Sequence, residues 1–122
     1  MSQYRTRRLG QMLQEKIGSL IIEGRIKDKR VNSFLSVTKV DVSGDLSFAD
    51  VYISDIRGMN IERGAEGLQS AAGFIQSQLG SSMRIRKIPH LRFHADTSIG
   101  ESFNLIKKIE NLTRDDSGID IT

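Results

Sequence analysis

The sequence predicts an α+β fold in which helices pack on one face of a three-stranded sheet. Two observations lead to this prediction. Apolar residues recur at three- and four-residue steps in some segments, as in helices, and at every second position in others, as in strands. These segments follow one another as helix, strand, strand, broken helix, strand and helix, which gives a two-layer sandwich. A chain of 122 residues, 38% of them hydrophobic, fits one domain with a small core.

Residues 5–26 have the spacing of an amphipathic helix. Three arginines, Arg5, Arg7 and Arg8, fall near its start, where the helix macrodipole disfavours cations. A bound phosphate would relieve that conflict, which makes the three arginines candidate contacts to a polyanion. The apolar stripe of this helix is Leu9, Met12, Leu13, Ile17, Leu20 and Ile21.

Two strands joined by a turn are expected next. Residues 34–42 are rich in β-branched side chains, and their apolar alternation slips, which predicts a bulge or bend near Thr38. A turn through Gly44 leads to a second strand over residues 47–54, so the two strands form an antiparallel hairpin. The inward-facing residues of the second strand are expected to be Ala49, Val51 and Ile53.

A helix and a third strand follow a glycine-flanked loop at residues 55–64. Helical spacing continues from Leu68 to Leu79 and ends at Gly80, and Pro89 then blocks a further helix. Alternation over Leu91, Phe93 and Ala95 predicts the third strand. From their apolar neighbours, the phenylalanines are expected in the core: Phe34, Phe48, Phe74, Phe93 and Phe103.

A last helix is predicted from a capping box formed by Ser98 and Glu101. Residues 114–122 have little to bury and are expected to form a flexible C-terminal tail after a domain that spans residues 1–113. The inward side of the last helix would carry Phe103, Ile106, Ile109 and Leu112.

Charge is unevenly distributed although the net charge is only +3. Residues 1–30 carry eight basic and three acidic side chains, and residues 81–95 carry four basic and no acidic ones. Two basic blocks suit a polyanion such as nucleic acid if the fold brings them together, and otherwise they are two solvated faces. The absence of cysteine, of a signal peptide and of a membrane-length apolar run predicts a cytoplasmic protein.

No catalytic constellation is visible in the sequence. There is no glycine-rich phosphate loop and no dinucleotide-binding fingerprint. His90 and His94 fall on a predicted strand, where a four-residue separation spans about 13 Å, too far for both to bind one metal ion. The chain is therefore expected to be no enzyme and to need no metal, cofactor or small-molecule substrate.

The stretch Ala71-Ala72-Gly73 inside the second helix leaves two interpretations open. In the first, small residues let the helix pack closely on the sheet. In the second, Gly73 breaks the helix, and the second half presents unpaired N–H groups and a positive dipole end to a phosphate. The missing side chains would then let a nucleic-acid backbone approach.

Several segments together resemble the bacterial ribosome-binding factor A family. They are RTRRLGQMLQEKIGSLI, VTKVDVSGDLSFADVYIS, AAGFIQSQLGSSMRIRKIPHLRFHAD and the amphipathic helix that follows. The resemblance covers about residues 4–112 and is most specific from Ala71 to Asp96. It implies a KH-like (type II) sandwich of order α-β-β-α-β-α, whose second α element is kinked at an Ala-x-Gly in place of the GXXG loop of KH domains.

The resemblance also implies a function. The chain would be a monomeric, non-enzymatic assembly factor that binds the immature small (30S) ribosomal subunit and 16S ribosomal RNA, and that assists late maturation and 5′-end processing. A protein-binding adaptor of the same fold, with no direct RNA contact, is the alternative, and a hydrolase that uses the histidines ranks far behind both.

The residues expected to contact RNA follow from their charge and position. Lys16 and Arg25 are weaker candidates. We expect the fold to bring the N-terminal arginines and the cations before Pro89 onto one surface beside the break. The expected RNA-binding residues are Arg5, Arg7, Arg8, Ala71, Ala72, Gly73, Arg84, Arg86, Lys87 and Arg92.

Overall fold

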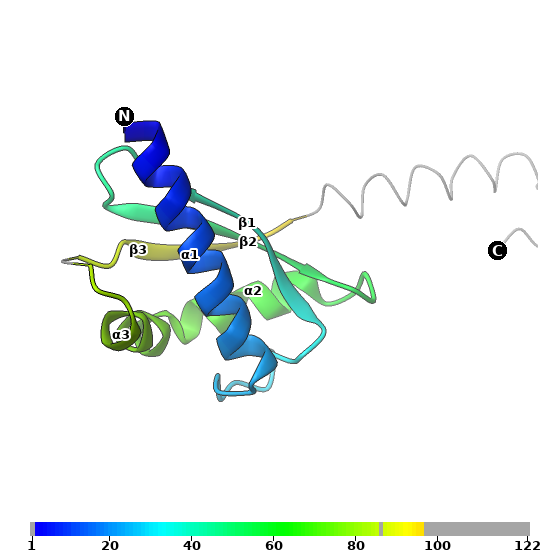
Figure 1. The fold of residues 1–122 in the computed structure, drawn as a ribbon. Coiled ribbons are helices and arrows are strands. Elements are labelled where there is room, and N and C mark those ends of the chain that lie inside the picture. The colour runs from blue at the N-terminus through cyan, green and yellow to red at the C-terminus, as the bar shows by residue number, and fades with distance from the viewer. Residues whose placement is uncertain (1, 86, 97–122) are drawn as a thin grey trace, which may run out of the picture.

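The computed structural model describes residues 2–85 and 87–96, and within them the elements follow the predicted order (Figure 1). The last helix and the tail predicted from residue 98 onward lie outside the described residues. In chain order the elements are helix α1, Ser2–Ile22; strand β1, Leu35–Val42; strand β2, Phe48–Asp55; helix α2, Ile61–Ser70; helix α3, Ala72–Ser82; and strand β3, His90–Ala95.

The three strands form one mixed sheet in the order β1-β2-β3. β1 and β2 pair in antiparallel fashion, which confirms the predicted hairpin. Their register shifts between Val37 and Lys39, which confirms the predicted bulge at Thr38. β3 pairs parallel to β2. The central strand is therefore β2, and β1 and β3 each have one outer edge.

Helices α1, α2 and α3 lie on the same face of the sheet, as predicted (Figure 1). The residues expected to face inward from β2, Ala49, Val51 and Ile53, are completely buried. Leu13 and Ile17 of α1 are equally buried in the same apolar cluster, which also contains residues of α2 and α3. The side chains that alternate with the inward residues are left on the opposite side, which we call the open face.

Helix α1 crosses β1 in close contact. A Cβ atom added to Gly10 would lie 2.9 Å from the carbonyl oxygen of Val40, so only glycine lets the helix approach this far. Gln14 donates its Nε2 to the carbonyl oxygen of Val37 at 3.1 Å. These contacts hold α1 along β1 and satisfy part of the backbone of that strand.

Helix α1 ends four residues earlier than the predicted boundary at residue 26. Gly24 adopts φ 68°, the left-handed conformation that favours glycine after the last turn of a helix. The N–H of Gly24 donates to the carbonyl of Ile21, and the N–H of Arg25 to the carbonyl of Leu20, both at 3.1 Å. This Schellman motif stops the helix and turns the chain back toward α3.

The phenylalanines do not all enter the core. Phe93 is buried, but Phe34, Phe48 and Phe74 expose 41%, 40% and 42% of their surface. The prediction is wrong for these three because apolar neighbours in sequence do not fix the side on which a ring lies. Phe48, for example, alternates with the inward residues of β2 and so belongs to the open face. Phe103 lies outside the described residues.

We expect Gly10→Ala to lower the free energy of unfolding by about 1–3 kcal/mol, because the added methyl group would collide with the backbone of β1. Gly18→Ala is the matched control in the same helix. Its Cβ would meet no atom within 4 Å, so it should raise stability by up to about 1 kcal/mol. Urea unfolding measures both values, and equal effects of the two changes would contradict the close α1–β1 contact.

Candidate nucleic-acid interface

The predicted break separates α2 from α3, and it lies at Ala71. This residue has φ −92° and ψ 7°, outside helical geometry, whereas Gly73 is the second residue of α3. The sequence therefore predicts where the helix breaks, but the residue that leaves the helical conformation is not the glycine. Alanine is the best helix former, so contacts with the rest of the fold must cause the break.

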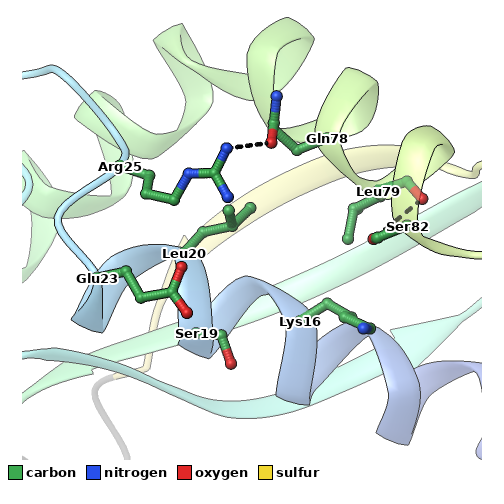
Figure 2. Close-up of a pocket in the computed structure, with 8 residues that line it drawn as sticks. All are labelled: Lys16, Ser19, Leu20, Glu23, Arg25, Gln78, Leu79 and Ser82. Carbon is green, nitrogen blue, oxygen red and sulfur yellow. Dashed lines mark hydrogen bonds between the residues drawn. The ribbon is translucent and has the colours of Figure 1, made fainter.

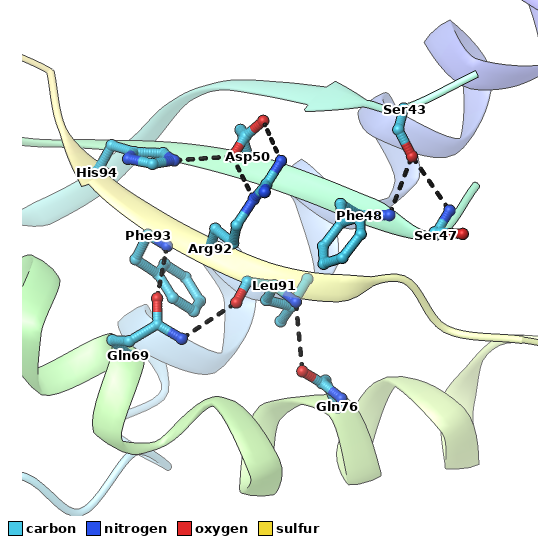
Figure 3. A network of polar contacts seen from close by, with 10 residues as sticks. All are labelled: Ser43, Ser47, Phe48, Asp50, Gln69, Gln76, Leu91, Arg92, Phe93 and His94. Carbon is cyan, nitrogen blue, oxygen red and sulfur yellow. Dashed lines mark hydrogen bonds and ion pairs between the residues drawn. The ribbon is translucent and has the colours of Figure 1, made fainter. Parts of the chain in front are cut away.

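Two glutamines, one before the break and one after it, form hydrogen bonds to the outer edge of β3 (Figure 3). Gln69 in α2 donates its Nε2 to the carbonyl oxygen of Leu91 at 3.1 Å, and its Oε1 accepts the N–H of Phe93 at 2.9 Å. Gln76 in α3 accepts the N–H of Leu91 at 3.3 Å. Because both helices are tied to the same strand at adjacent points, they meet at an angle, and the chain bends between them.

Close packing of small residues occurs in α2 and not at the break. A Cβ atom at Gly64 would lie 2.8 Å from the side chain of Leu35, and one at Gly67 would lie 2.9 Å from the Cβ of Arg30. A Cβ atom at Gly73 would meet nothing within 4 Å. Packing thus explains the glycines of α2, whereas Gly73 leaves its backbone open on the outside of the fold.

The backbone donors at the break are partly used within the chain. The N–H of Ala71 lies 3.1 Å from the carbonyl oxygens of both Gly67 and Leu68, and the carbonyl of Gln69 also accepts from the break. The N–H of Ala71, at the start of α3, is therefore paired within the chain and is not available to a phosphate. Side chains around the break must supply much of any attraction for an anion.

A basic connector, residues 23–30, lies against the break. Arg30 donates to the Oγ of Ser70, the last residue of α2, at 3.0 Å, and forms an ion pair with Asp28, also at 3.0 Å. Hydrogen bonds from Arg30 lower the pKa of Asp28 to about 2, which keeps this carboxyl ionised. These bonds fix the connector to α2.

Arg25 links the connector to α3 and borders two pockets. Its guanidinium donates to the Oε1 of Gln78 at 2.7 Å, as Figure 2 shows. The α1–α3 groove, of about 220 Å³, is lined by Lys16, Ser19, Leu20, Glu23, Arg25, Gln78, Leu79 and Ser82. The break pocket, of about 290 Å³, is lined by Arg25, Lys27, Asp28, Ser70, Ala71 and Phe74. Together they give the helix break a border of cationic side chains.

Lys27 is a candidate contact that the sequence reasoning missed. It belongs to residues 25–30, which contain four of the eight basic residues in the N-terminal basic block. This local cluster, directly after the predicted first helix, was the signal that could have identified it. Arg25, a weaker candidate in the sequence, is placed directly beside the break.

The N-terminal arginines lie far from the break. Arg5, Arg7 and Arg8 are exposed on the first turns of α1, whose 21 residues span about 30 Å before the connector begins. Arg5 lines a small pocket with Gly44 of the hairpin turn. The expectation that these arginines share a surface with the break is therefore wrong, because the helix that carries them runs the length of the sheet.

Arg84 and Lys87 are exposed in the segment between α3 and β3, and Arg86 lies outside the described residues. This segment enters β3 beside the hairpin turn, since the N–H of His90 donates to the carbonyl of Ser47 at 2.8 Å. Arg84 and Lys87 thus lie in a segment that ends beside the hairpin turn, near the N-terminal arginines, as expected for these two cations. The 11 residues of α3 separate Arg84 from the break.

Arg92 lies on the open face of the sheet, away from the break. Its guanidinium makes two bonds to the carboxylate of Asp50, at 2.9 and 3.1 Å, and His94 Nε2 lies 2.8 Å from the same carboxylate (Figure 3). Its charge is therefore already paired within the chain.

His90 and His94 are exposed as predicted, and the described residues contain no group of three or more side chains that could hold a metal ion. Nor does any helix among residues 2–85 and 87–96 have the length and apolarity to span a membrane.

Comparison with known proteins gives a consistent family. The chain matches the family description "Ribosome-binding factor A" over residues 5–109. Ribosome-binding factor A of Treponema pallidum is 46% identical over 92% of this chain and 90% of its own length. The crystal structure of ribosome-binding factor A from Thermus thermophilus is similar with a TM-score of 0.64 and 26% identity, over 74% of this chain and 93% of that one.

A second Thermus thermophilus structure is similar in fold. It is a homology model of ribosome-binding factor A, fitted into the cryo-electron microscopy map of its complex with the 30S subunit. The TM-score is 0.52 and the identity 24%, over 70% of this chain and 93% of that one.

The Asp28–Arg30 pair predicts a pH dependence of stability. Folding lowers the pKa of Asp28 from 3.8 to about 2, so its contribution is complete above pH 3.8 and is lost as the pH falls through about 2. Urea unfolding at a series of pH values should show a steeper loss of stability over this range for the unchanged chain than for Asp28→Asn. Parallel curves would show that the pair does not stabilise the connector.

Proposed function

This chain belongs to the ribosome-binding factor A family, and on that premise we propose that it binds the immature small (30S) ribosomal subunit and contacts 16S ribosomal RNA. By holding RNA elements in place it assists late maturation and 5′-end processing of that RNA. It acts in the cytoplasm as a monomer, through binding and without covalent chemistry. The names of its relatives and the 30S complex of a structural neighbour support this proposal.

The observation that carries the RNA contact is the open backbone at Gly73 next to a cationic border. A phosphate backbone can approach Gly73 closely because no side chain of the protein fills the space outside it. Arg25 and Lys27 in the break pocket, and Lys16 in the α1–α3 groove, are placed to neutralise phosphates on either side. Ala71 and Ala72 keep the rest of the break small.

A second contact is proposed at the opposite end of α1. The described cations there are Arg5, Arg7, Arg8, Arg84 and Lys87, and Arg86 of the predicted set lies outside the described residues. About 20–25 Å of helix α1 separates Arg5, Arg7 and Arg8 from the connector, so one protein can hold two RNA elements at a fixed separation. Arg92 contributes to RNA binding only if a phosphate displaces the carboxylate of Asp50, which makes it the weakest member of the proposed set.

Salt dependence of binding tests the proposal. Co-sedimentation with purified small subunits at increasing salt should give a steep loss of affinity, with a slope of about −0.7 to −0.9 in log K against log salt for each phosphate contact. Replacing both Arg25 and Lys27 by Gln should weaken binding and reduce the slope by about two contacts. Lys39→Gln, at a cation already paired with Asp41, is the control and should change little. Salt-insensitive binding that survives all these changes would instead indicate a protein-binding adaptor.

Gly73→Leu tests the open backbone directly. The variant should fold, because its Cβ meets nothing within 4 Å and leucine is a better helix former than glycine. Its affinity for small subunits should fall at least about tenfold, the equivalent of 1.4 kcal/mol, because the side chain would occupy the proposed RNA path. Gly18→Leu is the control. A Cβ atom at Gly18 also meets no atom within 4 Å, but Gly18 lies in α1 and not at the break. Full affinity of a stably folded Gly73→Leu chain would contradict the role of the break.

A further inference from the structure

Phe74 places an exposed aromatic ring beside the helix break. It is the third residue of α3, follows Gly73 directly and exposes 42% of its surface. Its side chain forms part of the wall of the break pocket. The next residue, Ile75, is fully buried in the core, so α3 is held firmly at this point and the outward position of Phe74 is fixed.

Two other phenylalanines have nearly the same exposure but are covered by cations of the chain itself. The guanidinium of Arg57 lies over the ring of Phe34, with 4.2 Å from its carbon to the ring centroid. The guanidinium of Arg92 lies over Phe48 in the same way, at 4.4 Å. Within residues 2–85 and 87–96, no aromatic ring or cationic group stacks on Phe74. Its ring face is therefore available to a partner.

The surroundings of Phe74 match the chemistry of a nucleotide. Arg25 and Lys27 line the same pocket, and Arg25 is held in place by Gln78. The carboxylate of Asp28, which also lines it, is paired with Arg30, so it offers little repulsion to a phosphate. An aromatic ring flanked by cations is the combination by which proteins bind single-stranded nucleic acids, with bases stacked on the ring and phosphates on the cations.

We propose that the break pocket binds one unpaired base of a single-stranded RNA segment, which stacks on Phe74 while the adjoining phosphates contact Arg25 and Lys27. The inference rests on the proposed function and specifies the RNA that is bound. A base inside a duplex has both faces covered by its neighbours, so only an unpaired nucleotide can present one to Phe74. The pocket volume of about 290 Å³ suits a single base and not a folded RNA element.

Binding of two ten-nucleotide probes tests the inference: an oligouridylate, and an oligomer of equal length with the same phosphates and no bases. Phe74→Leu should weaken binding of the oligouridylate by about 5- to 150-fold, the range for loss of one stacked base, and leave binding of the abasic oligomer unchanged. Phe74→Trp keeps an aromatic ring at this position and should bind the oligouridylate about as tightly as the unchanged chain does. Phe34→Leu is the matched control and should have no effect, because that ring is already covered. Fluorescence anisotropy gives the affinities, and urea unfolding shows that each variant is folded.

Four results would overturn the inference. They are equal losses for the two probes, equal losses for the two leucine variants, no binding of oligouridylate by the unchanged chain, and weaker binding of small subunits by Phe74→Leu without any change toward oligouridylate. The last of these would indicate that Phe74 docks on a ribosomal protein.

If the proposed function itself fails, the unchanged chain shows no salt-sensitive binding to small subunits at all. If only this inference fails, salt-sensitive binding of the unchanged chain to small subunits persists.

Discussion

The backbone groups along the outer edge of β3 are the constraint on which the candidate nucleic-acid interface depends. An unpaired N–H or carbonyl in this half-buried position costs free energy, and Gln69 and Gln76 satisfy three of these groups with side-chain amides. Because the two glutamines belong to α2 and α3, the same bonds set the angle between the helices. The kink at Ala71, and with it the outward position of Gly73 and Phe74, follows from how the sheet edge is closed.

Much of the fold could be predicted from the sequence because periodicity reports which side of an element faces the core. Leu13 and Ile17, the inward residues of β2 and the bulge at Thr38 all follow from local spacing. The early end of α1 was also encoded locally, in the glycine at residue 24. What periodicity does not report is the partner that lies against the other side of an element. The bond from Gln69 to Leu91 joins residues 22 apart, and no local pattern reveals it.

The candidate site was predictable to a smaller extent for the same reason. The sequence marks a break near Ala71 and two basic blocks, and both are present. It does not show that α1 separates the N-terminal arginines from the cations of the connector, nor that Arg92 is paired with Asp50. The cations that border the break come from the connector, which Arg30 ties to Ser70 across 40 positions of sequence. Charge counts along a chain predict a polyanion partner but not the surface that meets it.

The outer edges of both β1 and β3 are partly protected against pairing with a further strand. At β3 the side-chain amides of Gln69 and Gln76 occupy the positions where a neighbouring strand would bond. At β1 the bulge at Thr38 bends the strand, and Gln14 of α1 occupies the carbonyl oxygen of Val37. Addition of a further strand to a sheet edge is a common route to cross-β aggregates. Here it is hindered at both outer strands, because side chains of the protein already occupy part of each outer edge. The exposed ring of Phe74 thus belongs to a fold whose described sheet edges offer few free backbone groups to a further strand.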